Sequence, residues 1–375
     1  MIRKNSGKVQ NLGDGSLYEK KAKENRPPVL IIMQDIKELS LKELEDKLLS
    51  WGSPKYYARG IFNWIYQKGA FEFSRMSNLP APLRKTLTDE FSILGLSLAD
   101  LQESGDGTTK FLFELTDKNL VEAVNIPAAR RITGCISSQV GCKFGCHFCA
   151  SALKGFKRNL TLGEILDEVL YLKNNLKTGQ LTHIVFMGTG EPLDNYENVL
   201  GAIRLLNSPL AFNIGARRIT ISTCGIIPGI KRLQEEDLQI ELSISLHAAD
   251  DKTRSQLMPV NNKYPLAALI ECCREYIAKT NRQVTFEYIL IKGFNSDLAT
   301  ADKLVNLLKD LRLAKVNLIP ANPIAELKVF PPLEREILMF KDKLFNSGIN
   351  VTLRKERGQD IDAACGQLRL RHEQE

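Results

Sequence analysis

The spacing of apolar residues along the chain changes from a helical repeat to a strand-like one. Between residues 39 and 95, apolar positions recur every three or four residues, which predicts short amphipathic helices. Ser40 is placed to cap the first helix and Gly52 to end it, and the last helix follows Pro80. Together these helices predict a small helical domain over residues 35–100.

Beyond this domain, the pattern predicts an α/β fold. Two apolar runs flank a turn at residues 117–119 and indicate a β-hairpin extension over residues 105–130. From residue 131 to 355, apolar strands alternate with amphipathic helices, as in βα units around a parallel sheet. Six units predict a partial (β/α)6 barrel with its site at the carboxyl ends of the strands. The predicted strands cover residues 131–140, 181–188, 217–225, 240–247, 283–291 and 315–322, with a final strand at 349–355.

The chain is basic, with a formal net charge of +7 at pH 7. A basic surface supplies the salt-dependent part of RNA affinity, although many soluble enzymes carry a similar charge. Residues 1–30 form a predicted flexible basic tail that either contacts RNA or is only solvated. No apolar run reaches the ~18 residues of a membrane span, and the N-terminus lacks the apolar core of a secretory signal. We therefore expect a cytoplasmic protein.

The positions of the cysteines give the strongest indication of the chemistry of this protein. Of the eight cysteines, Cys135, Cys142, Cys146 and Cys149 fall within one short stretch. In a reducing cytosol, such crowding indicates metal binding or catalysis rather than disulfides. The spacing Cys142-x-x-x-Cys146-x-x-Cys149 offers three thiolates, which can hold three corners of a [4Fe–4S] cluster and leave one iron open. Structural zinc is the alternative, but it needs four ligands, and His147 directly follows Cys146, unlike the spacing of a zinc finger.

Polar residues recur at the predicted strand ends, where a barrel of this kind builds its site. The strand at 181–188 runs into GTGEPL, where Gly190 permits close backbone approach and Glu191 can accept from a cationic amino group. A single polar residue at such a position is more often satisfied within the fold, so it is the shared placement that favours a binding site. The other candidates for cofactor binding are Ser222, Ser245, Leu246, His247 and Asn322.

Several motifs together resemble those of the RlmN and Cfr family of radical S-adenosylmethionine (SAM) RNA methyltransferases. They include CISSQVGC, GFKRNLT, GEPLDN, SLHAAD and GQDIDAACGQL, and the resemblance extends from about residue 40 to 370. It implies that Cys142, Cys146 and Cys149 hold the [4Fe–4S] cluster, whose open iron is chelated by the amino and carboxylate groups of SAM. Cleavage of that SAM would yield a 5′-deoxyadenosyl radical.

The resemblance further implies methyl transfer through two additional cysteines. Cys365, in the predicted C-terminal loop at residues 356–375, would take a methyl group from one SAM. A second SAM would supply the radical that activates this methyl group for addition to an adenine carbon, so two SAM molecules are expected per turnover. Cys135 would then attack Cys365, which releases the product and leaves a disulfide, and Glu122 aligns with the family's proton acceptor.

The resemblance also bears on substrates and partners. The expected product is an adenosine methylated on carbon 2, in 23S ribosomal RNA at the peptidyl-transferase centre and 3′ to the anticodon in tRNA. Methylation of carbon 8 at the same ribosomal adenosine, as in Cfr-type antibiotic resistance, uses the same cysteines and is the alternative. A non-catalytic, metal-containing RNA-binding protein would need neither Cys135 nor Cys365, and a radical SAM activase of another protein would not need Cys365. A flavodoxin or ferredoxin is the expected electron donor, and a monomer is expected.

Overall fold

In a computed structural model of the chain, the structure describes residues 33–153, 155–322, 329–354, 357–358, 360–361 and 368. The predicted basic tail and Cys365 lie outside the described residues. Internal contacts divide the chain after Gln34, and residues 35–375 form the unit described below. Within the described ranges, no helix is long and apolar enough to cross a membrane.

The helices predicted near the start of this unit are confirmed. They are α2 (Leu41–Ser50), α3 (Tyr57–Phe62) and α4 (Ala81–Glu90). Ser40 and Glu43 form a capping box, in which each side chain accepts a hydrogen bond from the backbone N–H of the other residue. α3 continues directly into a π-helical turn at Asn63–Gln67, so the helical segment between the first and last predicted helices is composite. Shorter elements are β1 (Gln34–Asp35), β2 (Phe91–Ser92) and 3₁₀ turns at Ile36–Glu38 and Phe73–Arg75.

A ten-stranded sheet organises the described residues, in the order β14-β13-β12-β11-β10-β9-β6-β5-β4-β3. From β14 to β6 neighbouring strands are parallel, and from β6 to β3 they are antiparallel. The parallel strands are β6 (Arg131–Cys135), β9 (Leu181–Phe186), β10 (Ile219–Thr223), β11 (Glu241–Ser245), β12 (Val284–Leu290), β13 (Ala314–Pro320) and β14 (Asn350–Leu353). The antiparallel strands are β3 (Leu96–Glu103), β4 (Thr109–Leu115) and β5 (Leu120–Ala128).

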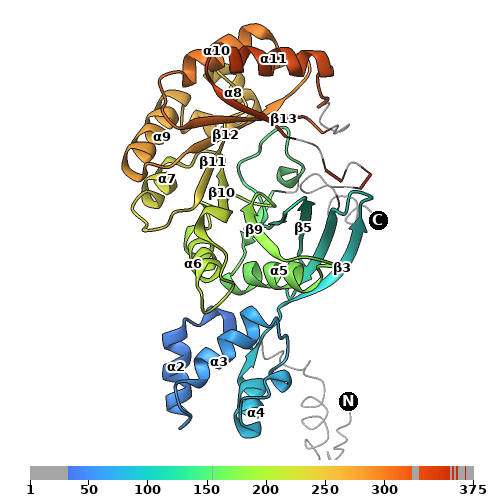
Figure 1. The fold of residues 1–375 in the computed structure, drawn as a ribbon, viewed down its shortest axis with the longest axis vertical. Helices are drawn as coiled ribbons and strands as arrows, with labels where there is room; N and C mark the ends of the chain where they lie inside the picture. The colour runs from blue at the N-terminus through green and yellow to red at the C-terminus, as the bar shows by residue number, and fades with distance from the viewer. Residues whose placement is uncertain are drawn as a thin grey trace, which may run out of the picture. The chain divides into compact units, whose positions relative to one another are not determined.

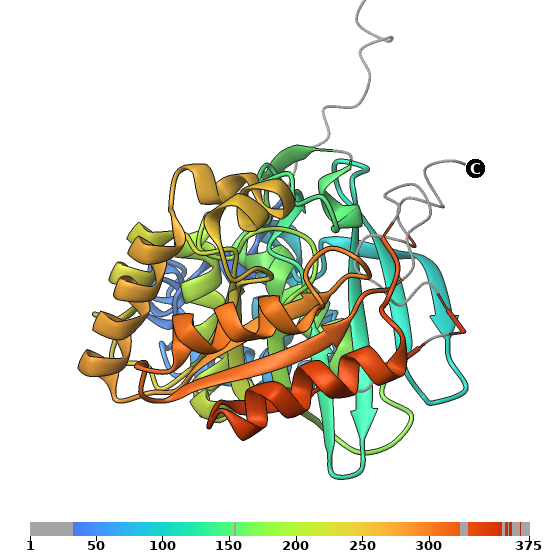
Figure 2. The ribbon, with the colours of Figure 1, turned by 90° about the horizontal axis from the view of Figure 1, so that it is seen from above.

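Helices follow each strand from β6 to β13 and lie on the outside of the curved row of strands (Figure 1, Figure 2). They are α5 (Leu162–Asn174), α6 (Tyr196–Asn207), α7 (Ile227–Leu233), α8 (Asp251–Leu257), α9 (Leu266–Thr280), α10 (Leu298–Leu308) and α11 (Glu334–Asn346). The arrangement confirms the predicted α/β class and partial (β/α)6 barrel, to which β14 adds a further parallel strand.

Some elements differ from the sequence-based prediction. β3 adds an edge strand to the predicted hairpin, and its mostly exposed side chains leave only a weak apolar repeat. The strand predicted over residues 131–140 is broken after Cys135: β7 (Gln139–Gly141) leaves the main sheet and pairs with β8 (Phe156–Asn159). The positions of α7 and α8 were not predicted, because each has only seven residues, too few to show a helical repeat.

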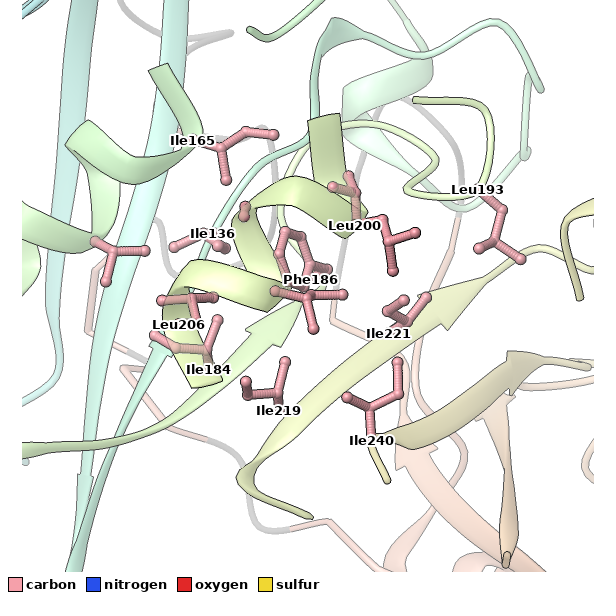
Figure 3. Close-up of a cluster of buried hydrophobic side chains, with 14 of the residues drawn as sticks. Ile136, Ile165, Ile184, Phe186, Leu193, Leu200, Leu206, Ile219, Ile221 and Ile240 are labelled. Carbon is pink, nitrogen blue, oxygen red and sulfur yellow. The ribbon is translucent and has the colours of Figure 1, made fainter. Parts of the chain in front are cut away.

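Apolar side chains on one face of β9 and β10 form a core with the helices that cover them. Ile184 and Phe186 of β9 and Ile221 of β10 are at most 1% exposed and belong to one buried cluster (Figure 3). Because successive side chains of a strand point to opposite faces, Val185 and Ser222 face the other way. Both of these residues line the pocket described below. The alternation therefore places Ile184 and Ile221 on a buried outer face and Val185 and Ser222 on an inner face that borders the pocket, which Phe186 at the end of β9 also lines.

A buried ion pair joins the segment ahead of α2 to α5. The Lys37 ammonium lies 2.9 Å from the Asp167 carboxylate, and both side chains are 0% exposed. Lys37 also contacts Asp35 at 2.7 Å and donates to the carbonyl oxygen of Ile93. Burial raises the pKa of Asp167 to about 7, against the opposing effect of Lys37. Lys37 therefore partly offsets the unfavourable burial of the Asp167 carboxylate charge.

We expect Lys37→Met to lower the free energy of unfolding by about 3–5 kcal/mol at pH 8, because it leaves the Asp167 charge buried without a cation. The loss should shrink towards pH 6, since an acid with a raised pKa takes up a proton in the folded state and so becomes neutral. Urea unfolding at both pH values measures this. The matched control is Lys47→Met, whose exposed pair with Glu90 spans 3.6 Å and should cost no more than about 1 kcal/mol. Equal losses in the two variants would contradict the prediction.

Candidate active site

A pocket of about 350 Å³ opens at the carboxyl ends of the parallel strands. The three cysteines of the predicted cluster motif line it, and so does Cys135 at the end of β6. Of the predicted cofactor residues, the pocket is lined by Gly190, Glu191, Ser222, Ser245, His247 and Asn322. Leu246 is fully buried behind them and does not line the pocket. The fold thus brings together residues that are almost 190 positions apart in the sequence, from Cys135 to Asn322.

The loop that carries the three cysteines is held at both ends. Gly141 adopts a φ of 76°, and a Cβ atom there would overlap the carbonyl oxygen of Gly155, so the close pairing of β7 with the loop's return needs glycine. The Cys142 N–H donates to that same carbonyl at 3.2 Å. In the middle of the loop, the His147 N–H donates to the Leu257 carbonyl at the end of α8, at 2.9 Å.

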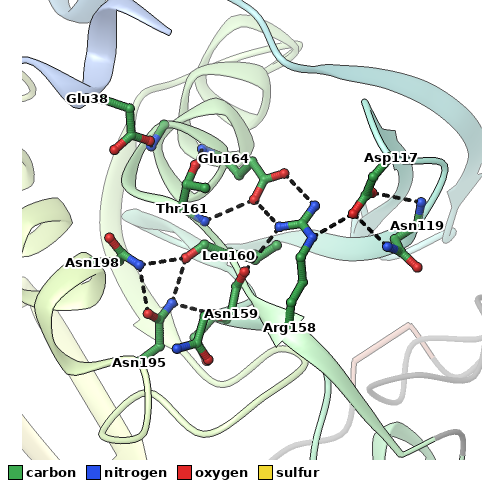
Figure 4. A network of polar contacts seen from close by, with 12 residues as sticks. Glu38, Asp117, Asn119, Arg158, Asn159, Leu160, Thr161, Glu164, Asn195 and Asn198 are labelled. Atoms are coloured by element: carbon green, nitrogen blue, oxygen red, sulfur yellow. Dashed lines mark hydrogen bonds and ion pairs between the residues drawn. The ribbon is translucent and has the colours of Figure 1, made fainter. Parts of the chain in front are cut away.

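Arg158 and Asn195 fix the segments that flank this loop (Figure 4). The Arg158 guanidinium donates to Asp117 in the hairpin turn at 2.6 Å and to both oxygens of Glu164 in α5 at 2.7 and 2.8 Å. The Asn195 amide donates to the carbonyls of Ser138 and Leu160, both at 2.8 Å. The cysteine loop is therefore anchored to the hairpin, to α5 and to the start of α6.

The three thiols suit a cluster better than a single metal ion. No three His, Cys, Asp or Glu side chains in the described part of the chain converge on one ion position, which is the arrangement that structural zinc requires. A cubane cluster instead binds each thiolate at a separate iron. Burial raises the pKa of Cys142 to about 12 and also raises that of Cys146, so these thiols need a bound cation to become thiolates. The donor set fits a cluster held by Cys142, Cys146 and Cys149.

Glu191 connects the ends of two strands beside the cysteine loop. Its carboxylate is buried and accepts from the backbone N–H of Leu193 at 3.0 Å and of Cys224 at 2.7 Å. The side chains of Thr223 and Cys224 also hydrogen-bond to this carboxylate, so four bonds fix its position at the strand ends. Gly190 precedes it with a φ of 109°, and a Cβ atom there would lie 2.6 Å from the side chain of Gln139. This close approach explains the glycine that the sequence places before the acid.

His247 is held as a neutral ring at the wall of the pocket. Its Nδ1 accepts from the Ile289 N–H at 3.0 Å, which leaves the ring proton on Nε2. The ring contacts Phe148 edge-to-face, with centroids 4.6 Å apart. Burial, together with the smaller effect of nearby Arg254, lowers the pKa of His247 to about 3. The side chain can therefore act as a hydrogen-bond donor to a ligand throughout the physiological pH range.

We expect His247→Gln to reduce the loss of unfolding free energy that the protein suffers as the pH falls below neutrality. In the unfolded chain His247 takes up a proton below about pH 6.5, whereas the folded protein resists protonation until about pH 3, so stability falls as the pH drops. Between pH 7.5 and 5.5 the wild-type protein should lose about 1.4 kcal/mol more than the variant. Anaerobic urea unfolding of both proteins at the two pH values provides the comparison. Parallel losses would show that His247 is not a buried neutral ring.

Glu122 lies beside the pocket but does not line it. Its carboxylate is 3.0 Å from the Lys110 ammonium of β4, and both side chains are almost fully buried. The Ser137 hydroxyl donates to the Glu122 carbonyl at 2.8 Å. Glu122 is two positions along β5 from Val124, which lines the pocket and is the register partner of Cys135. Glu122 and Val124 therefore share a face of β5.

The structure also reveals pocket residues that sequence reasoning missed. Glu287 on β12 is 6% exposed and lines the pocket, where its carboxylate accepts from the Asn317 amide at 2.7 Å and from the Ser243 hydroxyl at 3.3 Å. Arg354 and Arg357 line the same pocket near the C-terminus. A signal for Glu287 was present, since it is the only charged residue in the apolar run of β12.

Comparison with known proteins agrees with this geometry. The family model "Radical SAM superfamily" matches residues 136–305, and the "Ribosomal RNA large subunit methyltransferase N-terminal domain" matches residues 34–93. A "Probable dual-specificity RNA methyltransferase RlmN" of Symbiobacterium thermophilum is 46% identical over 90% of this chain and 92% of its own. A protein of the same name from Staphylococcus aureus is 45% identical over 91% of this chain and 94% of its own. The crystal structure of a radical SAM methyltransferase from Sphaerobacter thermophilus superposes with a TM-score of 0.86, at 42% identity over 89% of this chain and 98% of that one.

The fold, and the three-cysteine loop at its strand ends, define a radical SAM enzyme, a class that uses a [4Fe–4S] cluster and SAM. The similarity extends through the N-terminal helices, which lie outside the superfamily core. The chain belongs to the RlmN family of radical SAM RNA methyltransferases.

Proposed function

We propose that this enzyme methylates carbon 2 of an adenosine in 23S ribosomal RNA, at the peptidyl-transferase centre, and carbon 2 of the adenosine 3′ to the anticodon in tRNA. The observation that carries the two-cysteine methylation chemistry of this proposal is the placement of Cys135 in the same pocket as the three cysteines of the cluster motif and the polar strand-end residues. A radical SAM enzyme without a second thiol function would have no need of this residue. The relatives' names, which specify dual-specificity RNA methyltransferases, support two RNA substrates.

In this proposal, Cys142, Cys146 and Cys149 hold the cluster, and Gly190, Glu191 and the polar residues of the neighbouring strand ends hold SAM. When bound, the cluster and SAM supply a carbon radical that removes a hydrogen atom. His247 offers its Nε2–H and Glu191 its buried carboxylate, so the wall of the pocket presents both a hydrogen-bond donor and a negative charge to the cofactor. An electron donor of the flavodoxin or ferredoxin type would reduce the cluster.

Two cysteines and one acid perform the methylation chemistry in the proposal. Cys365 carries the methyl group as a thioether, because carbon 2 of adenine lies between two nitrogens and is too electron-poor to attack a methyl donor. Once the activated methyl carbon has added to the ring, Glu122 accepts the proton that leaves carbon 2. The ring adduct would give up its unpaired electron to the cluster. Cys135 attacks the sulfur of Cys365, a disulfide forms, and the carbon–sulfur bond breaks with its electron pair on the transferred carbon, which takes up a proton to become the methyl group. Since Cys135 is 6% exposed and lines the pocket, it is shielded from bulk solvent until this step.

Mass spectrometry of RNA nucleosides tests the proposal. RNA from a strain that lacks the gene should lose 2-methyladenosine from both 23S ribosomal RNA and tRNA, and a plasmid copy of the gene should restore it in both. Loss of 8-methyladenosine would instead identify the Cfr-type reaction. Unchanged methylation in both RNAs would overturn the proposal.

A further inference from the structure

Arg254 is a buried cation whose bonds all go to neutral oxygens. Its side chain, on α8, is 0% exposed. The guanidinium donates to four carbonyl oxygens and one amide oxygen in the described part of the chain. These acceptors are Cys224 at 2.8 Å, the Asn261 side chain at 3.0 Å, Ser245 at 3.1 Å, Leu246 at 3.2 Å and Tyr264 at 3.5 Å.

A buried guanidinium charge is stable only if a nearby anion offsets the cost of its desolvation. Burying a charge without a counter-charge is strongly unfavourable, and buried arginines are usually paired with carboxylates. Asp251 acts on Arg254 electrostatically, but its Oδ1 is taken by the Asn261 amide at 2.9 Å and by the Leu266 N–H at 2.8 Å. Burial lowers the pKa of Arg254, while the neighbouring Cys224 and Cys146 sulfurs act in the opposite direction. The described protein residues thus leave the charge without an anionic hydrogen-bond partner.

The bonds of Arg254 converge on the parts of the fold that build the pocket. The carbonyls of Cys224, Ser245 and Leu246 belong to the ends of β10 and β11, which carry Ser222, Ser245 and His247 into the pocket. The same short helix accepts the cysteine-loop bond from His147 through the Leu257 carbonyl.

The surroundings of α8 also reach the cysteine loop. Cys224 and Met258 share a small apolar cluster with Cys146 and Phe148. Arg254 therefore lies behind the wall of the pocket on the side of the cysteine motif, rather than at a distant structural site.

We propose that Arg254 is the buried counter-charge of the iron–sulfur site and a positioning residue for the strand ends that hold SAM. This rests on the proposed placement of the cluster on Cys142, Cys146 and Cys149. Three thiolates make the site anionic, and reduction adds a further negative charge, which a fixed cation in a low-dielectric wall stabilises. Arg254 would thus raise the reduction potential of the cluster. Its bonds to the carbonyls of Cys224, Ser245 and Leu246 would also tie the ends of β10 and β11 to α8, whose Leu257 carbonyl accepts the cysteine-loop bond from His147.

Two substitutions separate charge from geometry. After anaerobic reconstitution, Arg254→Gln removes the charge, and Arg254→Lys keeps the charge but loses most of the hydrogen bonds. At a fixed applied potential, electron paramagnetic resonance should show the reduced-to-oxidised ratio of the cluster falling about tenfold in Arg254→Gln, a shift of about 59 mV to more negative potential for one electron. Arg254→Lys should stay within about threefold of the wild-type ratio. The matched control is Arg274→Gln, an exposed arginine on α9, which should leave the ratio unchanged.

The outcomes distinguish this inference from the proposed function. If the wild-type protein takes up no iron, the proposed function fails and the inference with it. If Arg254→Gln carries a full cluster with the wild-type potential, or if Arg254→Lys shifts the potential as far as Arg254→Gln, the inference alone fails.

Should Arg254→Gln not fold, the wild-type holoenzyme labelled with ¹⁵N-arginine provides an independent measurement. Because Arg254 is buried, its Nε proton should exchange slowly with solvent and give a sharp resonance. This resonance is assigned as the one that is missing from the spectrum of Arg254→Lys. Reduction of the cluster to its paramagnetic state should broaden this resonance. An unchanged line width would contradict the inference.

Discussion

Cys146→Ala should abolish RNA methylation and most of the iron binding of the reconstituted protein. A [4Fe–4S] cluster with an open iron has only three protein ligands, and losing one leaves two irons without a protein thiolate. The Cys146 side chain is half-buried against a small apolar cluster, where alanine can replace its packing but not its sulfur as an iron ligand. Iron and sulfide analysis after anaerobic reconstitution, together with a methylation assay on RNA, measures both effects.

Cys272→Ala is the matched control for this loss. Cys272 is 2% exposed on α9, outside the pocket lining, and its Sγ lies 4.0 Å from the Ile227 carbonyl. Its replacement should cost a little stability and leave iron content unchanged. Full iron content in Cys146→Ala, or equal iron loss in the two variants, would contradict the assignment of the cluster ligands.

Cys365→Ala should stop methyl transfer while leaving the cluster intact. The proposed reaction needs a sulfur that carries the methyl group to the base, and alanine cannot form the thioether. The variant should keep wild-type iron content and still bind SAM, yet mass spectrometry should detect no methyladenosine in the RNA. Methylation at the wild-type rate would rule out a methylcysteine intermediate and would indicate a radical SAM enzyme with a different mechanism.

Cys135→Ala should give a different defect from Cys365→Ala. Without a thiol to attack Cys365, the bond from its sulfur through the transferred carbon to the RNA persists. Denaturing electrophoresis should therefore show a covalent protein–RNA species in Cys135→Ala and none in Cys365→Ala or in the double variant. A clean product from Cys135→Ala would show that another group resolves the intermediate.

The cysteine motif could be recognised from sequence because its chemistry is local. Cys142, Cys146 and Cys149 lie within one loop, so their spacing alone indicates three thiolates close together. The strand ends were also predictable, because the apolar runs of a parallel sheet mark where each strand stops, and Glu191, Ser222 and His247 follow from that. The structure places these residues around one pocket, as the predicted barrel requires.

Residues that act through long-range contacts could not be found in the same way. Arg254 follows SLHAAD in what reads as an ordinary polar segment, and only the fold shows that its guanidinium spans the ends of β10 and β11. Lys37 is likewise unremarkable in sequence, yet it pairs with Asp167, which is 130 positions away. Burial and tertiary pairing, rather than periodicity, decide the roles of such residues.

The central claim is that three cysteines hold a cluster whose open iron faces the strand-end pocket. Electron paramagnetic resonance of the reconstituted and reduced wild-type protein, recorded with and without SAM, tests it most directly. The account predicts about four irons per chain and a cluster signal whose shape changes when SAM binds the open iron. A protein that retains one zinc and no iron, or a cluster signal that SAM leaves unaltered, would contradict it.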